Sequence, residues 1–185
     1  MRAKNLLHGL LFISFLMSSL SLASVVDLKK TAAAGSGCKN GNVYLEKTSD
    51  GAQIYFNDLF IQVQDSPRSL IRKNCNLAIP ISLPAGKLLV VDDVTLIGIS
   101  YLGQSASSKI TTETFFSGGT GQKLTVGNAK PGLKFNYLTQ PDTLISGCGQ
   151  DTLLRTRATA LLKPKLGYNL LYLSKLKLNY HLEDC

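Results

Sequence analysis

The sequence predicts an all-β protein: an antiparallel, jelly-roll-like β-sandwich stapled by two disulfide bonds, after an N-terminal signal peptide. Three observations lead to this fold class. Short segments of alternating apolar and polar residues follow one another along the chain, and glycine- or proline-containing turns separate them. After the N-terminal apolar run, no segment shows the apolar period of 3.6 residues that is typical of a helix. Four cysteines accompany this pattern of strands.

The N-terminal segment has the order of a secretory signal peptide. Arg2 and Lys4 form a short basic region, residues 6–22 are almost wholly apolar, and small residues lead up to Ala23. A membrane anchor is the alternative, but serines interrupt the apolar run and no basic stop-transfer flank follows it. We therefore expect residues 1–23 to be the signal peptide of an exported protein, periplasmic or extracellular, whose mature chain has no membrane span.

The rest of the chain is expected to form one domain. Residues 24–37 are small and polar, which is typical of a flexible lead. Residues 38–185 have a length that suits a single hydrophobic core, and they contain neither an internal repeat nor an interdomain linker.

The first expected strands form a hairpin. Residues 42–47 and 53–56 alternate in polarity on either side of Asp50 and Gly51. An Asp-Gly pair between two such segments is a strong turn signal, because glycine adopts the positive φ that tight turns need. Residues 59–63 continue as a further strand.

The strand expected over residues 76–83 directly follows Cys75 and contains a proline. Its leucines and isoleucines share one face, and Pro80 lies on the other. Proline cannot donate a hydrogen bond to a neighbouring strand. We therefore expect this strand at a sheet edge, or with the amide position of Pro80 unpaired.

Further strands are expected at short intervals, over residues 88–102, 109–116, 122–126, 133–138, 152–162, 168–173 and 175–182. The first of these should bend near Asp92-Asp93 or near Gly98. The last alternates cleanly, and its inward residues are expected to be Leu176, Leu178, Tyr180 and Leu182.

The cysteines are Cys38, Cys75, Cys148 and Cys185. An even number in an exported chain indicates two disulfides, for which three pairings are possible. We favour Cys38–Cys75 and Cys148–Cys185, because these pairs close two loops of similar length. No Cys-x-x-Cys spacing or histidine cluster is present, so a zinc site is not expected.

A series of short motifs runs in order through nearly the whole mature chain: Gly35-Ser36-Gly37-Cys38, Asp50-Gly51, Phe56-Asn57-Asp58-Leu59-Phe60, Arg72-Lys73-Asn74-Cys75, Pro84-x-Gly86, Gly98, Phe115-Phe116-Ser117-Gly118, Cys148-Gly149 and Cys185. In this order the chain resembles domain-of-unknown-function family 4360, small secreted proteins of fungi and bacteria. Ile97 and Leu182 depart from the family pattern, in which arginine and tryptophan are common at these places. The resemblance implies export and this fold, and it implies no activity.

The sequence offers little catalytic chemistry. His181 is the one histidine after the expected signal peptide, and no Gly-x-Ser-x-Gly motif is present. With every cysteine paired, no thiol nucleophile remains. We therefore expect a protein that is not an enzyme and has no cofactor, with a hydrolase as the less favoured reading. Asp92 and Asp93 are weak candidates for calcium binding, because hard cations prefer carboxylate oxygens.

The composition is basic. The formal net charge is +8, and 18 Lys and Arg against 12 Asp and Glu remain once Arg2 and Lys4 leave with the signal peptide. This excess is spread along the chain, as on an ordinary solvated surface. For an exported protein, an acidic glycan is a better fit to this charge than nucleic acid. The candidate ligand-binding residues are Tyr44, Tyr55, Arg155 and Arg157. The expected function is non-catalytic binding of a glycan or protein at the cell surface or in the extracellular space. The alternative is a structural or secreted effector protein that acts through an envelope or extracellular protein partner; the sequence indicates no oligomeric state.

Overall fold

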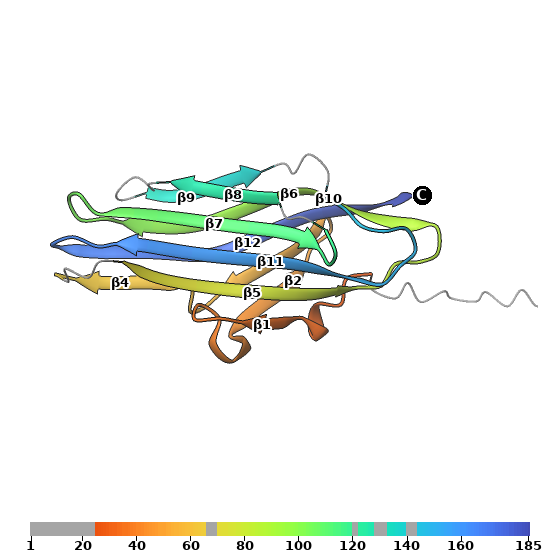
Figure 1. Ribbon diagram of the computed structural model, residues 1–185, viewed down its shortest axis with the longest axis horizontal. Coiled ribbons are helices and arrows are strands. Elements are labelled where there is room, and N and C mark those ends of the chain that lie inside the picture. Colours follow the sequence, from red (N-terminus) through yellow and green to blue (C-terminus); the bar gives the residue numbers. More distant parts are fainter. Residues whose placement is uncertain (1–24, 66–69, 120–121, 128–132, 140–143) are drawn as a thin grey trace, which may run out of the picture.

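The computed structural model describes residues 25–65, 70–119, 122–127, 133–139 and 144–185, and the expected signal peptide lies outside these ranges. The described residues form two β-sheets that lie one behind the other in Figure 1. Neighbouring strands in both sheets are antiparallel. This arrangement confirms the predicted all-β sandwich.

The five-stranded sheet has the order β1 (Ala32–Ala34), β5 (Ile71–Ile81), β11 (Thr152–Lys163), β7 (Ser107–Phe116) and β8 (Gln122–Gly127). The seven-stranded sheet has the order β10 (Leu144–Ile145), β6 (Lys87–Tyr101), β12 (Tyr168–Asp184), β3 (Gly51–Phe56) and β2 (Val43–Lys47). In addition, β9 (Leu133–Thr139) pairs with β6, and β4 (Phe60–Gln64) pairs with β12. Two short 3-10 helices are η1 (Leu28–Lys30) and η2 (Lys39–Gly41). None of the helices within the described ranges is long and apolar enough to cross a membrane.

The core is the layer between the two sheets. In β5, Leu77, Ile79 and Ile81 are at most 3% exposed, as their alternation predicts. In β12, Leu176 and Leu178 are at most 1% exposed. Each fully buried side chain of this size contributes roughly 1.5–3 kcal/mol, so the facing strands hold the sheets together. Leu182 was also expected inward, but it is 37% exposed, because it lies near the end of β12 beyond the core.

Both predicted disulfides are present. Cys38 and Cys75 are bonded with a Cα–Cα distance of 5.3 Å, and Cys148 and Cys185 with a Cα–Cα distance of 6.0 Å. Cys75 lies inside β5, which begins at Ile71, so the expectation that the strand starts after this cysteine was wrong. The first bridge therefore joins the N-terminal segment to the middle of the strand β5.

The segment over 24–37 is not the flexible lead that its composition suggests. From residue 25 onwards it lies along β5: Val26 is 4% exposed and bridges to Ile81, and β1 pairs with residues of β5. Glycine is needed in this segment because the backbone packs too closely against β5 to leave room for a side chain. A Cβ on Gly35, whose φ is +137°, would collide with the carbonyl oxygen of Asn74. The sandwich therefore begins before Cys38.

Pro80 lies in β5 at a position beyond its pairing with β1, where the strand needs no amide donor. The strand is not at the edge, because β1 pairs with it over Asn76 to Ala78 and β11 pairs with it on the other side. The Pro80 carbonyl oxygen accepts a hydrogen bond from the Asp27 amide at 3.0 Å. In an antiparallel strand the N–H and C=O of one residue point to the same side, so the missing N–H faces the N-terminal segment and leaves the β11 ladder intact.

Both expected bends in β6 coincide with irregularities in its pairing with β12. The register shifts between Asn179 and Tyr180, where Asp92 is the extra residue on β6. It shifts again between Leu173 and Lys175, opposite Gly98. The two strands predicted over 168–173 and 175–182 are therefore one strand, β12, in which Ser174 is the extra residue.

Candidate functional site

The outer face of the seven-stranded sheet carries a row of aromatic and polar side chains. Tyr44 of β2 lies opposite Tyr55 of β3, and Tyr55 lies opposite Lys175 of β12. Residues at opposed positions on antiparallel strands share a face, so these three side chains are neighbours. Glu46 and Gln53 form the next opposed pair on the same face. We call these five residues the tyrosine surface.

Polar contacts fix the position of Tyr55 on this surface. Its hydroxyl lies 2.7 Å from Gln53 Oε1 and 3.1 Å from Glu46 Oε2, both of which are acceptors. Lys175 Nζ lies 4.6 Å from the centre of the Tyr55 ring and donates to Gln53 Oε1 at 3.0 Å. A cation this close to an aromatic ring is attracted to the electron-rich face. The Tyr55 side chain is therefore held at its hydroxyl by Gln53 and Glu46, and at one face of its ring by Lys175.

Tyr44, by contrast, presents its ring to solvent. It is 59% exposed, and its ring centre lies 5.6 Å from that of Tyr55 at an interplanar angle of 46°. Among the described residues, none forms a hydrogen bond with the Tyr44 hydroxyl. The surface thus offers one fixed ring and one open ring, side by side on a rigid sheet.

An ion pair lies at one end of the tyrosine surface. Lys177, two residues after Lys175 in β12, places its Nζ 3.0 Å from Asp50 Oδ2 in the turn between β2 and β3. Hydrogen bonds from Lys177 and Thr48 lower the pKa of Asp50, which keeps the carboxylate charged. This pairing offsets part of the positive charge that the lysines bring to the sheet.

A second aromatic pair lies further along β12. The rings of Phe60 and Tyr172 meet edge to face at 6.4 Å, and Lys73 Nζ lies 4.6 Å from the Phe60 ring centre. Phe60 is 37% exposed, and the Tyr172 hydroxyl donates to the Phe56 carbonyl oxygen at 3.1 Å. Sequence reasoning missed this pair and Lys175. The alternation of β12 would have placed Tyr172 outward, between the buried Leu171 and Leu173, but only the strand pairing brings it next to Phe60.

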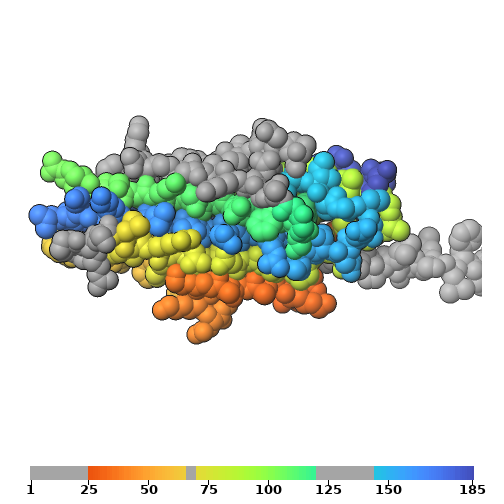
Figure 2. Space-filling model, viewed as in Figure 1, coloured from red at the N-terminus to blue at the C-terminus, as the bar shows by residue number. Residues whose placement is uncertain are grey.

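The arginines lie on the other sheet. Arg155 and Arg157 are exposed on β11, which Figures 1 and 2 show between β5 and β7 at the front of the molecule. Arg155 Nε donates to Ser117 Oγ at 3.2 Å. Arg157 Nε donates to Asn76 Oδ1 at 2.9 Å, and its Nη1 lies 3.7 Å from Glu113 Oε2. The structure therefore does not bring the arginines together with Tyr44 and Tyr55.

The bulge at Asp92 changes the geometry of the expected calcium candidates. Val91 and Val94 are both buried, so Asp92 and Asp93 both lie on the solvent side of β6 rather than on opposite faces. Each is already engaged: Asp92 with His181 at 2.9 Å, and Asp93 with Asn179 Nδ2 at 2.8 Å. In the part of the chain that the structure describes, no group of three or more histidine, cysteine or acidic residues could hold a metal ion.

His181 lies between two carboxylates on the surface. Its Nδ1 contacts Asp92, and its Nε2 lies 2.9 Å from Glu183 Oε1. Hydrogen bonding to Asp92, and then to Glu183, raises the pKa of His181. Both ring nitrogens face carboxylates, so neither is directed at a hydroxyl that it could activate as a nucleophile.

Comparisons with known proteins place the chain in a family. No curated protein matches it. Among solved structures, the carbohydrate-binding module TmCBM61 in complex with β-1,4-galactotriose is 13% identical, with 85% of this chain and 90% of that chain covered, at a TM-score of 0.35. So loose a likeness carries no inference about ligand. A family model described as "Domain of unknown function (DUF4360)" matches residues 24–169, and the chain belongs to this family.

Proposed function

We propose that this protein is an exported, non-catalytic binding module whose tyrosine surface binds glycan chains. The observation that carries the proposal is the open Tyr44 ring, 59% exposed beside the fixed ring of Tyr55. A large exposed ring is costly to keep in water and is common at binding surfaces. The strand pairing places both residues on one face, and polar contacts fix the Tyr55 ring before a ligand arrives, which lowers the entropy cost of binding.

The polar groups around the rings fit the chemistry of a sugar. A sugar ring has C–H groups that can lie against an aromatic face and hydroxyls that both donate and accept hydrogen bonds. Glu46 and Gln53 supply acceptors, and the Lys175 ammonium supplies a donor, all on the same face. Without Arg2 and Lys4 of the signal peptide, 18 Lys and Arg stand against 12 Asp and Glu, and this net charge of +6 favours chains that carry acidic groups.

The chemistry of the described side chains supports a role without catalysis. The four cysteines form two disulfide bonds, so none is a free thiol. Both ring nitrogens of His181 contact carboxylates. Two disulfides also fit a protein that works outside the cytoplasm. Intact-mass measurement of the mature protein tests export: we expect the chain to begin near Ser24, and retention of residues 1–23 contradicts the proposal.

A glycan array tests the ligand. We expect the wild-type protein to bind at least one group of acidic glycans, and Y44A to weaken that binding about tenfold, the loss of roughly one stacking contact. Y168A is the matched control. Tyr168 is likewise an exposed tyrosine, at 45%, but it lies at the start of β12 and outside the tyrosine surface. Binding that is equal in Y44A and wild type, or absent from the array, contradicts the proposal.

A protein partner is the second candidate, and a specific feature favours it. Besides Tyr44, the seven-stranded sheet exposes Phe60, Tyr101 and Tyr168 at 37%, 47% and 45%. Exposed aromatic side chains are enriched at protein interfaces. Capture of one protein from envelope or culture extracts, lost in F60A and retained in Y44A, would establish this alternative.

A further inference from the structure

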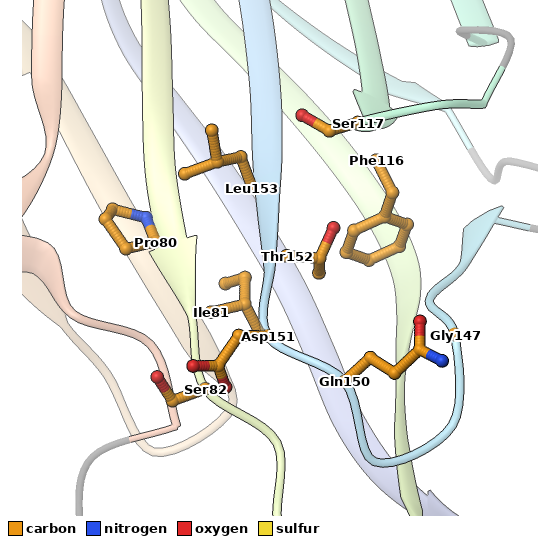
Figure 3. A pocket seen from close by; sticks show the side chains of 10 residues that line it. All are labelled: Pro80, Ile81, Ser82, Phe116, Ser117, Gly147, Gln150, Asp151, Thr152 and Leu153. Carbon is orange, nitrogen blue, oxygen red and sulfur yellow. The ribbon is translucent and has the colours of Figure 1, made fainter.

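A cavity lies at one end of the five-stranded sheet, where β5 and β7 end and β11 begins (Figure 3). Its volume is about 680 Å³, within the usual range for small-molecule sites. The apolar part of its lining consists of Pro80, Ile81, Phe116 and Leu153. The tyrosine surface is on the other sheet, so the cavity is separate from it.

The loop over residues 146–151 forms one wall, and it is held to β6 and to Cys185. The Ser146 amide donates to the Leu89 carbonyl oxygen at 3.0 Å, and the Gly149 amide donates to the Lys87 carbonyl oxygen at 2.8 Å. The disulfide of Cys148 ties the same loop to the last residue of the chain. The wall is therefore formed before a ligand binds.

The polar lining has groups with no partner in the protein. Gln150, Asp151 and Thr152 line the cavity. Figure 3 shows Asp151 beside Ser82 and Thr152 beside Phe116, with Ser117 on the far side of Phe116. Across the described residues, no hydrogen bond or ion pair engages the side chains of Gln150, Asp151 or Thr152. A carboxylate, an amide and a hydroxyl thus line an apolar floor, and a ligand can reach them without breaking a contact among the described residues.

The lining favours no net charge on its ligand. It carries one carboxylate, Asp151, and Arg155 lies at the rim, hydrogen-bonded to Ser117, so the two opposite charges offset each other. A ligand with several groups that both donate and accept, and with an apolar side, satisfies the amide, the hydroxyls and the floor together. We propose that this cavity is a second binding site, for the neutral terminal unit of a saccharide.

A site-resolved titration tests this independently of the tyrosine surface. The disulfide-bonded protein, labelled with ¹⁵N, is titrated with methyl glycosides of galactose, glucose, mannose and N-acetylglucosamine, and with glucuronic acid and glucosamine as charged comparators. We expect one or more neutral glycosides to shift the backbone amides of residues 147–152. D151A should weaken that binding about tenfold, because a hydrogen bond to a charged group is lost.

The controls separate this proposal from the proposed function. Lys163 is exposed near the end of β11 remote from the cavity, and K163A should bind as wild type. Y44A should also keep the shifts at 147–152 while its binding on the glycan array weakens. Unchanged amides with every neutral glycoside, tighter binding of a charged comparator, or full affinity in D151A would each overturn the second site and leave the tyrosine surface unaffected.

Discussion

The two disulfides look equivalent in the sequence and differ in the fold. Both have a sequence separation of 37, so the chain-entropy model assigns each the same stabilisation, about 4 kcal/mol. Cys38 and Cys75 are fully buried within the core, whereas Cys148 and Cys185 are exposed at the end of the sandwich. Loop length therefore does not decide what a disulfide does; its position relative to the core does.

The largest effect is expected from the buried bridge. C38A/C75A should lower the free energy of unfolding by about 4 kcal/mol, because the N-terminal segment loses its tie to the middle of β5. Chemical denaturation at constant pH measures this loss. A loss below about 1 kcal/mol would mean that the pairing of β1 with β5 holds the segment without the bridge.

A smaller effect is expected from the exposed bridge. C148A/C185A should lower the free energy of unfolding by about 2 kcal/mol or less, because the end of β12 can open without unfolding the core. Hydrogen exchange should rise in residues 146–150 and 183–185 and stay unchanged in β5.

Mild reduction separates the two bridges in one sample. Exposed sulfurs are accessible to a thiol reductant in the native state, whereas sulfurs inside the core are not. Alkylation followed by peptide mapping should therefore label Cys148 and Cys185 first. Equal labelling of all four cysteines would contradict the contrast between the bridges.

The smallest expected effect is pH-dependent and lies next to the exposed bridge. The folded protein raises the pKa of His181 above its ordinary value of 6.5, so the protonated ring stabilises the fold. This contribution is fully present below the unfolded pKa and is lost as the pH rises through the folded pKa. An NMR titration of His181 measures the shift, and D92N should bring the pKa back towards 6.5. An unchanged value in D92N would show that Asp92 does not cause it.

Much of the fold could be predicted from local patterns. Alternation predicted most strands, and the similar lengths of the two loops led to the correct choice among the three possible cysteine pairings. The order of strands in a sheet depends on contacts between distant segments, which a local pattern does not contain. For this reason the pairing of 32–34 with β5, and the union of 168–173 with 175–182, were missed.

The candidate sites divide in the same way. Tyr44 and Tyr55 were both predicted as ligand-binding residues, and the structure places their rings side by side. Nothing in the sequence around Lys175 indicates that β12 lies beside β3, so its contact with Tyr55 could not be predicted. Arg155 and Arg157 were grouped with the tyrosines because a single chain does not reveal which sheet a strand joins. The cavity wall over 146–151 has no periodic pattern at all.

The position of β12 also sets the order in which the molecule can fold. This last strand, 17 residues long, pairs with β6 on one side and with β3 and β4 on the other. The hairpin of β2 and β3 and the long strand β6 precede β12 in the sequence, and each needs it as a partner. The seven-stranded sheet therefore cannot assemble until β12 has been synthesised. Because pairing between such distant segments is slow, the edges of β3 and β6 stay unpaired in the meantime.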